Sequence, residues 1–338
     1  MQIFHNPNYN FVKYRWHALV VSWVLILAGL VMIWTTGIPL GVEFSGGTQV
    51  VLQFDQQRPS IDQVRTALDK HFPGGGQNVV VQTYGTEVQR EILVRVPHTG
   101  KESGTELTRT ADEIQAAVRA GGLGAFKVAG TEVVGPVVGQ ELASKGTWAF
   151  LLSLFFILLY LWFRFELSFA VGATVATLHD ILITMALLMF FRYEMSLNII
   201  AALLTMTGYS TNDTIVIFDR VRENLRGMRR DNIKDIVNVA VNQTLNRTII
   251  TGGTALLSVI ALYFFGGEVL RGFAFTMIVG IITGTYSSVF IAAAIVTFWR
   301  HGKGGARIVA ASAAMPAAQR PTTTARQRKG SRNGARAS

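Results

Sequence analysis

The sequence contains no cysteine and few charged residues. Without cysteine, the 338-residue chain has neither disulfides nor thiolate metal sites. Charged residues make up only 15% of the chain and hydrophobic residues 50%, which is too apolar for an ordinary soluble domain of this length. A GxxxxGK[ST] phosphate loop is also absent, and the six histidines show no metal-ligand spacing. We therefore expect no metal, no cofactor, no ATP-driven pump and no enzyme activity in this chain.

The apolar residues are concentrated in long runs. One such run fits a buried helix of a soluble protein, but six of them favour helices that cross the roughly 30 Å hydrocarbon layer of a membrane. The first run resembles a signal peptide, yet Thr-Thr-Gly-Ile-Pro follows it rather than a cleavage site, so we expect a retained helix. The runs are 18–36, 147–163, 167–191, 197–218, 248–265 and 272–299.

The net charge of +10 is concentrated in the last residues of the chain. Residues 300–338 contain nine lysines and arginines and no acid. Because this segment has no apolar period, 301–338 is predicted to be a disordered cytoplasmic tail that touches anionic membrane lipids. We expect no specific binding of nucleic acid.

The positions of the basic residues orient the predicted helices, because short loops rich in lysine and arginine stay in the cytoplasm. Lys13 and Arg15 precede the first run, Arg164 follows the second, and the basic tail follows the sixth. Further basic residues between the fourth and fifth runs are Arg220, Arg222, Arg226, Arg229, Arg230, Lys234 and Arg247. We expect six helices in a bacterial-type inner membrane, with both termini in the cytoplasm.

Between the first two runs the pattern changes to that of an ordinary folded domain. Strands are predicted at 48–54, 78–82, 92–96 and 126–134, and helices after Ser60 and over 106–120. This βαββαβ order is typical of a ferredoxin-like α+β fold, which hosts many functions and identifies none. The predicted division is residues 1–39 for the N-terminus and first helix, 40–143 for the extracytoplasmic domain, 144–300 for helices two to six, and 301–338 for the tail.

Asp213 is an acid inside the fourth apolar run. It lies six residues before Asp219 and so about 9 Å inside the membrane by helical rise. A charged carboxylate facing lipid there costs at least ~2.5 kcal/mol, so Asp213 should face the bundle interior. Thr205, Gly208 and Asn212 recur at helical spacing, which predicts a small, polar face with Asp213 at its edge.

Arg247 is expected to open the fifth helix, with Thr251 one turn further on. Ionised Asp213 would attract Arg247 and protonated Asp213 would release it, which makes a protonation switch. The alternative is a static ion pair that holds the bundle together. The sixth helix carries Gly280 and Gly284 in GxxxG spacing, followed by Ser287 and Ser288, which predicts close helix packing.

His179 and Asp180 form a second polar site in the third helix, to which we also assign Asp219. Adjacent side chains point about 100° apart on a helix, so the first two are not expected to form a triad with each other. A structural hydrogen bond and a proton relay both remain open.

These motifs resemble those of the SecF family, the smaller half of the SecD–SecF protein-export complex. The Tyr-Ser-x-Asn-Asp-Thr and Asp-Arg-x-Arg-Glu-Asn strings are the most specific. The matching strings are Gly41-Val-Glu-Phe-Ser-Gly-Gly-Thr48, Val134-Gly-Pro-Val-Val-Gly-Gln-Glu-Leu142, His179-Asp180, Gly208-Tyr-Ser-Thr-Asn-Asp-Thr214, Phe218-Asp-Arg-Val-Arg-Glu-Asn224, Arg247-Thr-Ile-Ile-Thr251 and Gly284-Thr-Tyr-Ser-Ser288.

The resemblance implies an accessory subunit of the Sec translocase in the RND superfamily, which pairs with SecD and uses the proton-motive force in late steps of preprotein translocation. It implies SecYEG, YajC and YidC as further partners, and it assigns Asp213 and Arg247 to proton transport. We place Asn212 and Thr251 in the same proton path. The Ala292-Ala-Ala-Ile end of the sixth helix and the long tail depart from the family pattern.

Two other functions fit part of the sequence. An RND-like exporter of small molecules or lipids would use the same ions, but a single short extracytoplasmic domain and six helices argue against it. A scaffold that binds the translocon and transports nothing would tolerate Asp213→Asn. One carboxylate with nearby hydroxyls suits either a proton or a sodium ion as the coupling ion.

Overall fold

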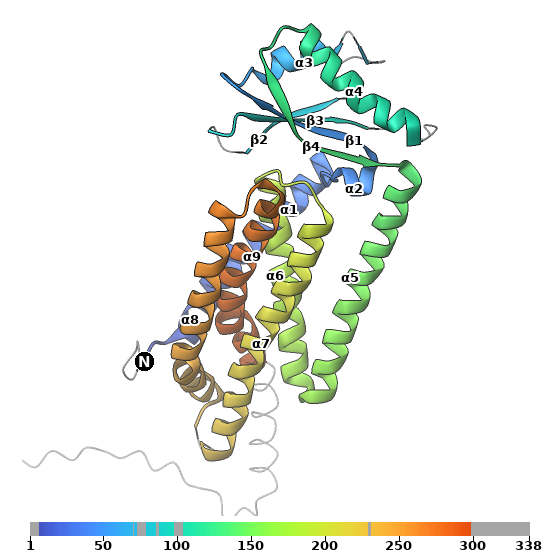
Figure 1. The fold of residues 1–338 in the computed structure, drawn as a ribbon. Coiled ribbons are helices and arrows are strands. Elements are labelled where there is room, and N and C mark those ends of the chain that lie inside the picture. Colours follow the sequence, from blue (N-terminus) through green and yellow to red (C-terminus); the bar gives the residue numbers. More distant parts are fainter. Residues whose placement is uncertain are drawn as a thin grey trace, which may run out of the picture.

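A computed structural model describes residues 7–69, 71–72, 79–85, 88–97, 104–228 and 231–298. It has two parts stacked end to end, a bundle of long helices and a four-stranded sheet with two helices above it (Figure 1). We call β1 to β4 with their helices, residues 47–134, the sheet domain. The predicted basic tail, 301–338, lies outside the described residues.

Long helices make up the bundle. They are α1 (Arg15–Thr36), preceded by the short η1 (Phe11–Tyr14), α5 (Pro136–Arg164), α6 (Leu167–Phe190), α7 (Leu197–Gly227), α8 (Ile233–Phe265) and α9 (Glu268–Ser287), which continues as the π-helix η2 (Ser288–Ala292). By length and composition, five helical segments in the described part of the chain can cross a membrane. α7 is not one of the five, because uncharged polar residues such as threonine, serine and asparagine lower the hydropathy of its sequence, although it lies beside the others.

Two of these helices begin well before their apolar runs. α5 starts at Pro136, a residue suited to the first turn of a helix because its missing N–H needs no partner there. α8 starts at Ile233, where the Asn232 side chain caps it by accepting from the Lys234 N–H. Arg247 therefore lies within α8, and the prediction that it opens the fifth helix was wrong.

The sheet domain has the element order predicted from the sequence. Its elements are β1 (Gly47–Phe54), α3 (Ile61–Asp69), β2 (Val80–Tyr84), β3 (Glu91–Val96), α4 (Gly104–Ala120) and β4 (Phe126–Val134). The strands pair antiparallel in the order β2-β3-β1-β4. Alternate β1 side chains such as Val50 and Leu52 are buried against α3 and α4, which cover the far face, so the opposite face is turned toward the bundle (Figure 1).

Close packing of α7 against α9 forms the centre of the bundle. A Cβ added at Gly280 would lie 2.4 Å from the Met206 Sδ, and one at Gly284 would lie 2.8 Å from the Ser210 Cβ. The two glycines thus allow a contact that no larger residue permits, which confirms the predicted GxxxG packing.

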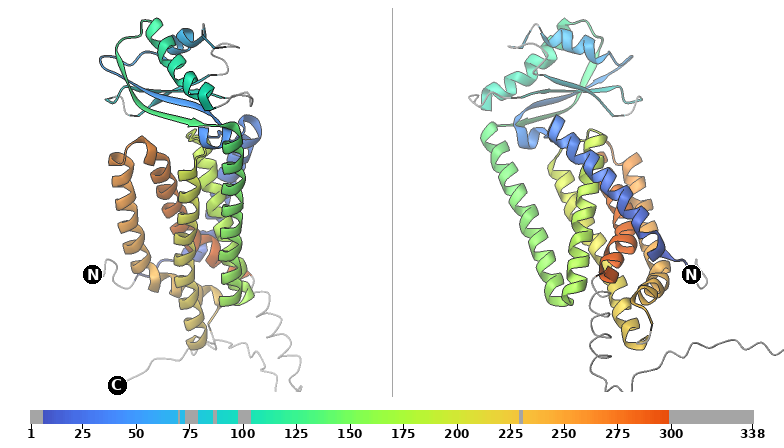
Figure 2. Two further views of the ribbon diagram at one scale, coloured as in Figure 1. Left: turned by 45° about the vertical axis from the view of Figure 1, so that its right-hand side comes forward. Right: turned by 180° about the vertical axis from the view of Figure 1, so that it is seen from behind.

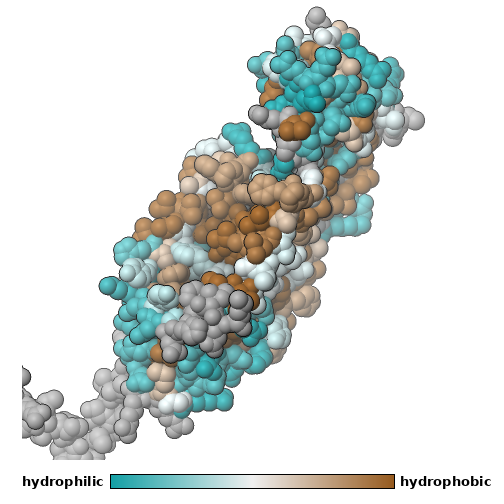
Figure 3. All heavy atoms as spheres, turned by 60° about the vertical axis from the view of Figure 1, so that its left-hand side comes forward, coloured by the Kyte–Doolittle hydropathy of each residue, from teal (hydrophilic) through white to brown (hydrophobic). Residues whose placement is uncertain are grey.

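The outer surface of the bundle is apolar. A hydrophobic band crosses the helices between two hydrophilic ends, one of which is the sheet domain (Figure 3). α5 stands at the edge of the bundle (Figure 2), and its Leu152, Phe156 and Phe163 side chains are exposed. Apolar side chains exposed over this much surface mark a face that lipid or another membrane protein covers.

Candidate functional site

Asp213 of α7 is buried among three helices, as the sequence predicts for an acid inside the bundle. Its Oδ1 accepts a hydrogen bond of 2.7 Å from the Thr248 hydroxyl of α8. Its Oδ2 accepts one of 3.0 Å from the Ser288 hydroxyl at the start of η2. Hydroxyl groups from two neighbouring helices therefore replace water around this carboxylate, which lowers the cost of its burial.

Arg247 is exposed and does not pair directly with Asp213. Among the described residues, no ion pair within 4.0 Å includes Arg247, although its charge is close enough to act on Asp213. Asp213 is instead held by hydroxyl groups. The direct contact that a static Asp213–Arg247 ion pair requires is therefore absent from the described residues.

The other two residues of the predicted proton path do not contact the carboxylate. Asn212 is exposed on a different side of α7, with Thr205 and Gly208, and lines a groove against α5. The polar face inferred from helical spacing thus points out of the bundle. Asp213 still points inward, because adjacent residues such as Asn212 and Asp213 point about 100° apart on a helix. The Thr251 hydroxyl bonds to the Arg247 and Thr248 carbonyls of its own helix.

His179 and Asp180 contact each other in the middle of α6. The His179 Nδ1 lies 3.0 Å from the Asp180 Oδ1, because the two side chains turn toward each other. The Asp180 Oδ2 accepts hydrogen bonds from Ser210 of α7 and, at 2.8 Å, from Ser287 of α9. Asp180 is only 1% exposed.

Asp219 belongs to a different region. It lies near the far end of α7, exposed, 3.9 Å from the Arg164 guanidinium and 3.8 Å from that of Arg222. The assignment of Asp219 to the same polar site as Asp180 was therefore wrong.

The four hydroxyl groups that hold the two acids were not among the predicted site residues. Ser210 and Thr248 are part of the matching strings but were given no role, and Ser287 and Ser288 were assigned a role only in helix packing. The useful signal is the pair of serines that follows GxxxG, since small residues that bring helices together also bring their hydroxyl groups close to buried acids.

At the other end of α7, a junction joins the bundle to the sheet domain. The Arg95 Nη1 of β3 lies 2.8 Å from the Glu194 Oε2 in the α6–α7 loop and donates to the Leu40 carbonyl at 2.7 Å. The Gln82 amide of β2 donates to the other Glu194 oxygen at 3.2 Å. Residues 39–41 and Met195 exchange backbone hydrogen bonds in a parallel bridge. We call these contacts the junction.

The junction also includes the first turn of α7. The Glu43 carboxylate of the short α2 (Val42–Ser45) accepts a 2.5 Å hydrogen bond from the Leu197 N–H, and the Ser196 hydroxyl accepts one from the Ile199 N–H. A negative charge is favourable there because the N–H groups at a helix N-terminus are unpaired and carry positive partial charge.

Burial changes the acidity of two carboxyl groups at the junction. Loss of hydration raises the pKa of Glu194 above its ordinary 4.5, although Arg95 and Gln82 oppose the shift. Burial, with the nearby charge of Glu43, also raises the pKa of Glu132 on β4. Both acids thus hold protons more readily than exposed ones.

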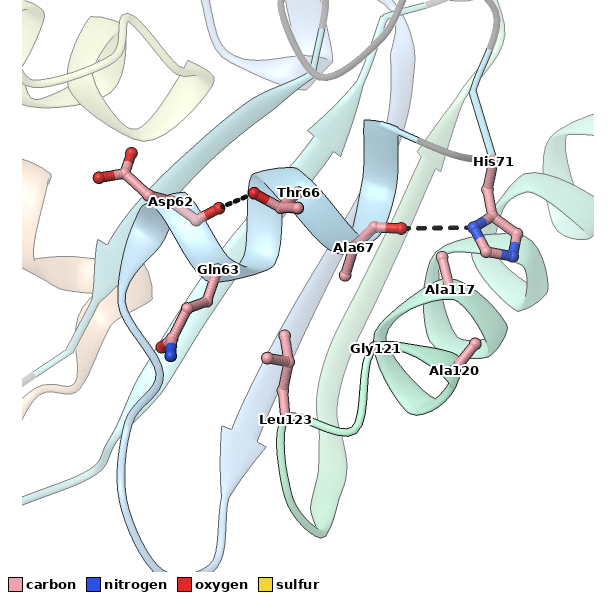
Figure 4. Close-up of a pocket in the computed structure, with 9 residues that line it drawn as sticks. All are labelled: Asp62, Gln63, Thr66, Ala67, His71, Ala117, Ala120, Gly121 and Leu123. Atoms are coloured by element: carbon pink, nitrogen blue, oxygen red, sulfur yellow. Dashed lines mark hydrogen bonds between the residues drawn. The ribbon is translucent and has the colours of Figure 1, made fainter.

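A hollow of about 550 Å³ lies between α3 and α4 in the sheet domain (Figure 4). Ala67, Ala117 and Gly121 form part of its floor. The Thr66 hydroxyl and the His71 Nδ1 already bond to backbone carbonyls of α3. Within the described parts of the chain, no group of three or more His, Cys, Asp or Glu side chains is placed to hold a metal ion.

Comparison with known proteins matches both parts of the molecule. Residues 114–302 match the family model "Protein export membrane protein SecD/SecF, C-terminal", and residues 31–57 match the model of the SecD/SecF GG motif. The second match covers the end of α1, α2 and all of β1, and so includes Leu40 and Glu43 of the junction.

Two relatives of similar length are each named as the SecF subunit of a protein translocase. The chain is 43% identical to "Protein translocase subunit SecF" of Desulfurispirillum indicum, over 86% of this chain and 91% of the relative. It is 38% identical to the SecF subunit of Escherichia coli O157:H7, over 85% of this chain and 86% of the relative.

A solved structure shows the same fold. The crystal structure of SecDF, a translocon-associated membrane protein from Thermus, matches with a TM-score of 0.76 and 36% identity. The match covers 88% of this chain but only 39% of the Thermus chain. The chain described here belongs to the SecD/SecF family of protein-export membrane proteins, on the SecF side.

Proposed function

We propose that the chain is a SecF-type subunit of a protein translocase, which pairs with a SecD-type partner and uses an ion gradient to promote late steps of preprotein translocation. The names of its relatives support the subunit assignment. The Thermus chain supports the pairing, since this chain corresponds to only 39% of it and leaves room for a second half. The exposed apolar face of α5 supplies surface for such a partner. We include SecYEG, YajC and YidC as further partners.

The proposed arrangement places six helices, α1 and α5 to α9, across the bacterial inner membrane. α7 is counted although its polar residues make its sequence less apolar than those of the other five, because it packs between helices that qualify. The bias of basic loops toward the cytoplasm then puts both termini inside and the sheet domain outside. The observed strand order, with its βαββαβ connections, supports a ferredoxin-like fold for residues 40–143.

Ion coupling is assigned to Asp213, and its burial between α7, α8 and η2 is the observation that carries the proposal. The Asp213 carboxylate is buried, bonds to two hydroxyl groups and has the cation Arg247 at longer range. Because charges interact strongly inside a bundle that excludes water, the gain or loss of its charge changes the local electrostatic energy by a large amount. A proton that crosses 100 mV supplies about 2.3 kcal/mol, comparable with the few kcal/mol that separate conformational states.

α7 provides a mechanical link from Asp213 to the sheet domain. Sixteen residues separate Leu197 from Asp213, which is about 24 Å along a rigid helix. Glu43 and Ser196 hold the first turn of α7, and the Arg95–Glu194 pair holds the loop before it. A change in the packing of α7 around Asp213 would therefore move the junction and the sheet domain with it.

The experiment that tests this function is preprotein export in membrane vesicles that carry a SecD partner and either the unchanged chain or its Asp213→Asn form at matched expression. We expect the substitution to abolish the gradient-dependent part of export and to leave assembly intact. Unchanged export would make Asp213 structural and favour the translocon scaffold. Ion flux without any preprotein effect would favour an exporter of other cargo.

A further inference from the structure

Two consecutive serines connect the two buried acids of the bundle. The Ser287 hydroxyl lies 2.8 Å from the Asp180 Oδ2, and the Ser288 hydroxyl lies 3.0 Å from the Asp213 Oδ2. Adjacent residues of a helix point about 100° apart, so one serine faces α6 and the next faces α7. The two acids, from different helices, thus bond to neighbouring residues of one backbone.

Each serine also has a second acceptor within reach. The Ser287 hydroxyl lies 3.2 Å from the Gly284 carbonyl, and the Ser288 hydroxyl lies 3.0 Å from the Thr285 carbonyl. A hydroxyl group has a single proton to donate. An ionised carboxylate is the stronger acceptor, whereas a protonated one donates to the serine oxygen and leaves the serine proton to the carbonyl. The orientation of each serine therefore depends on the charge of its acid.

These serines lie where the helix geometry changes. α9 ends at Ser287 and the π-helix η2 begins at Ser288. Single π-turns in α-helices occur frequently at functional sites, because their wider turn shifts side chains from the regular spacing. A change in hydrogen bonding at one serine therefore acts on a backbone segment that the other serine shares.

A third hydroxyl joins the two acids through α7. Ser210 donates to Asp180 from a position three residues before Asp213, on the same side of the helix. The approach of α9 at Gly284, where an added Cβ would lie 2.8 Å from the Ser210 Cβ, keeps the three hydroxyl groups together. Any shift of α7 that follows the charge of Asp213 also moves a hydrogen-bond donor of Asp180.

Asp180 has the surroundings of a group that exchanges a proton. Its hydrogen bonds come from His179, Ser210 and Ser287, and the His179 ring stacks on Tyr286, whose hydroxyl contacts Ser22 of α1. In the described part of the chain, the buried His179 Nε2 has no hydrogen-bond partner. Among the described residues, His179 is the ionisable side chain that bonds to Asp180; the Tyr286 ring stacks on His179, and Asp213 lies three residues after Ser210 on α7.

We propose that Asp180 is a second proton-binding group of the bundle and that Ser287, Ser288 and Ser210 make the protonation of Asp180 and Asp213 depend on each other. The two acids then act as one coupled pair, with His179 holding Asp180 on the side away from the serines. The biological role of this coupled pair rests on the proposed function in ion coupling. Its test measures protonation and does not require export.

The test is infrared difference spectroscopy of the full chain with its SecD partner in lipid nanodiscs, titrated from about pH 4 to about pH 10. Carboxylic-acid C=O bands are assigned with Asp180→Asn and Asp213→Asn. We expect each substitution to remove one titrating band and to move the midpoint of the other by about one pH unit or more, a tenfold change in proton binding. The proposal would be overturned if Asp180→Asn left the carboxyl spectrum unchanged, or if the titration midpoint of each acid stayed the same when the other acid was substituted.

The role of the serines has its own variant and control. The double variant Ser287→Ala, Ser288→Ala should reduce the mutual shift of the two midpoints at least about threefold, whereas Thr276→Val should leave it unchanged. Thr276 is a buried α9 hydroxyl whose bond goes to the Gly272 carbonyl of its own helix. An undiminished mutual shift in the double variant would show that the serines are not the link.

Two further measurements keep the test decisive if a variant does not assemble or if export fails. If Asp180→Asn does not assemble, the same bands are followed in the otherwise unchanged chain labelled with ¹³C-aspartate, with and without the serine substitutions. Preprotein export measured on the same samples separates the proposed function from the coupling of the two acids. If export does not depend on the ion gradient but the two midpoints still shift, only the proposed function is contradicted.

Discussion

The Arg95 guanidinium of β3 lies 2.8 Å from the Glu194 carboxylate of the α6–α7 loop, and both side chains are largely buried. The pair joins the sheet domain to the loop that leads directly into α7. Because a buried ion pair leaves an uncompensated charge when one partner is removed, this contact should be sensitive to substitution in a way that surface pairs are not.

Arg95→Gln should loosen the junction. We expect the free energy of local opening of residues 191–196 to fall by about 2 kcal/mol, because Glu194 then stays buried without its cation. Hydrogen exchange of these amides measures the effect, as exchange roughly 30-fold faster. Arg109→Gln removes the exposed Arg109–Glu113 pair on α4 and should change exchange little; equal effects of the two variants would contradict the role of the junction.

The junction should also depend on pH through Glu194. Burial raises the pKa of this carboxyl above 4.5, so the folded state binds its proton more tightly than the unfolded state does. Its contribution to stability is therefore full below 4.5 and is lost as pH rises through the folded pKa. Protection of residues 191–196 should fall over that window in the unchanged chain and fall less in Glu194→Gln. A steeper fall in the variant would show that another group titrates.

Gly284→Ala should separate α9 from α7. The new Cβ would lie 2.8 Å from the Ser210 Cβ and 3.2 Å from its Cα, and backbone cannot move aside as a flexible side chain can. We expect a loss of about 1–3 kcal/mol, measured as a lower thermal midpoint in nanodiscs. Gly253→Ala is the matched control, since no described atom beyond its own stretch of helix lies within 4 Å of its added Cβ and alanine favours the helix. A midpoint lowered equally by both would contradict the packing argument.

Glu43→Ala should fray the first turn of α7. The carboxylate accepts from the Leu197 N–H, and loss of such a cap costs about 1 kcal/mol. Amides 197–199 should exchange about fivefold faster, while Glu43→Gln, which retains an acceptor but no charge, should show a smaller effect. Identical exchange in Glu43→Ala and the unchanged chain would rule out the cap.

Much of the fold could be predicted because its signals are local. Alternation and turn residues placed the last strand at 126–134 and the first at 48–54, within one residue of β4 and β1. The start of α8 could not be placed, because its first turns mix apolar with polar and charged residues and lie outside the apolar run that defined the predicted helix. The same holds for α5, whose first eleven residues precede its run.

The site was predictable only in part. Length and hydropathy identify Asp213 as a costly acid that must face inward, but helical spacing alone gives no direction for that face, so Asn212 was placed beside it and Thr248 was missed. The partners of Asp213 come from helices that are 35 and 75 residues away in sequence. Which helix faces which acid depends on the packing of the whole bundle, and no local pattern encodes it.

The central claim is that the charge of Asp213 controls the position of the sheet domain through α7. Because the chain has no cysteine, Ala120→Cys on α4 and Leu167→Cys, an exposed residue at the start of α6 and outside α7, give two labelling sites unique in this chain for a distance measurement in sealed vesicles with the SecD partner. The account predicts that an imposed ion gradient changes the distance between the labels, and that Asp213→Asn abolishes this change. A distance that responds equally in both chains, or in neither, would contradict it.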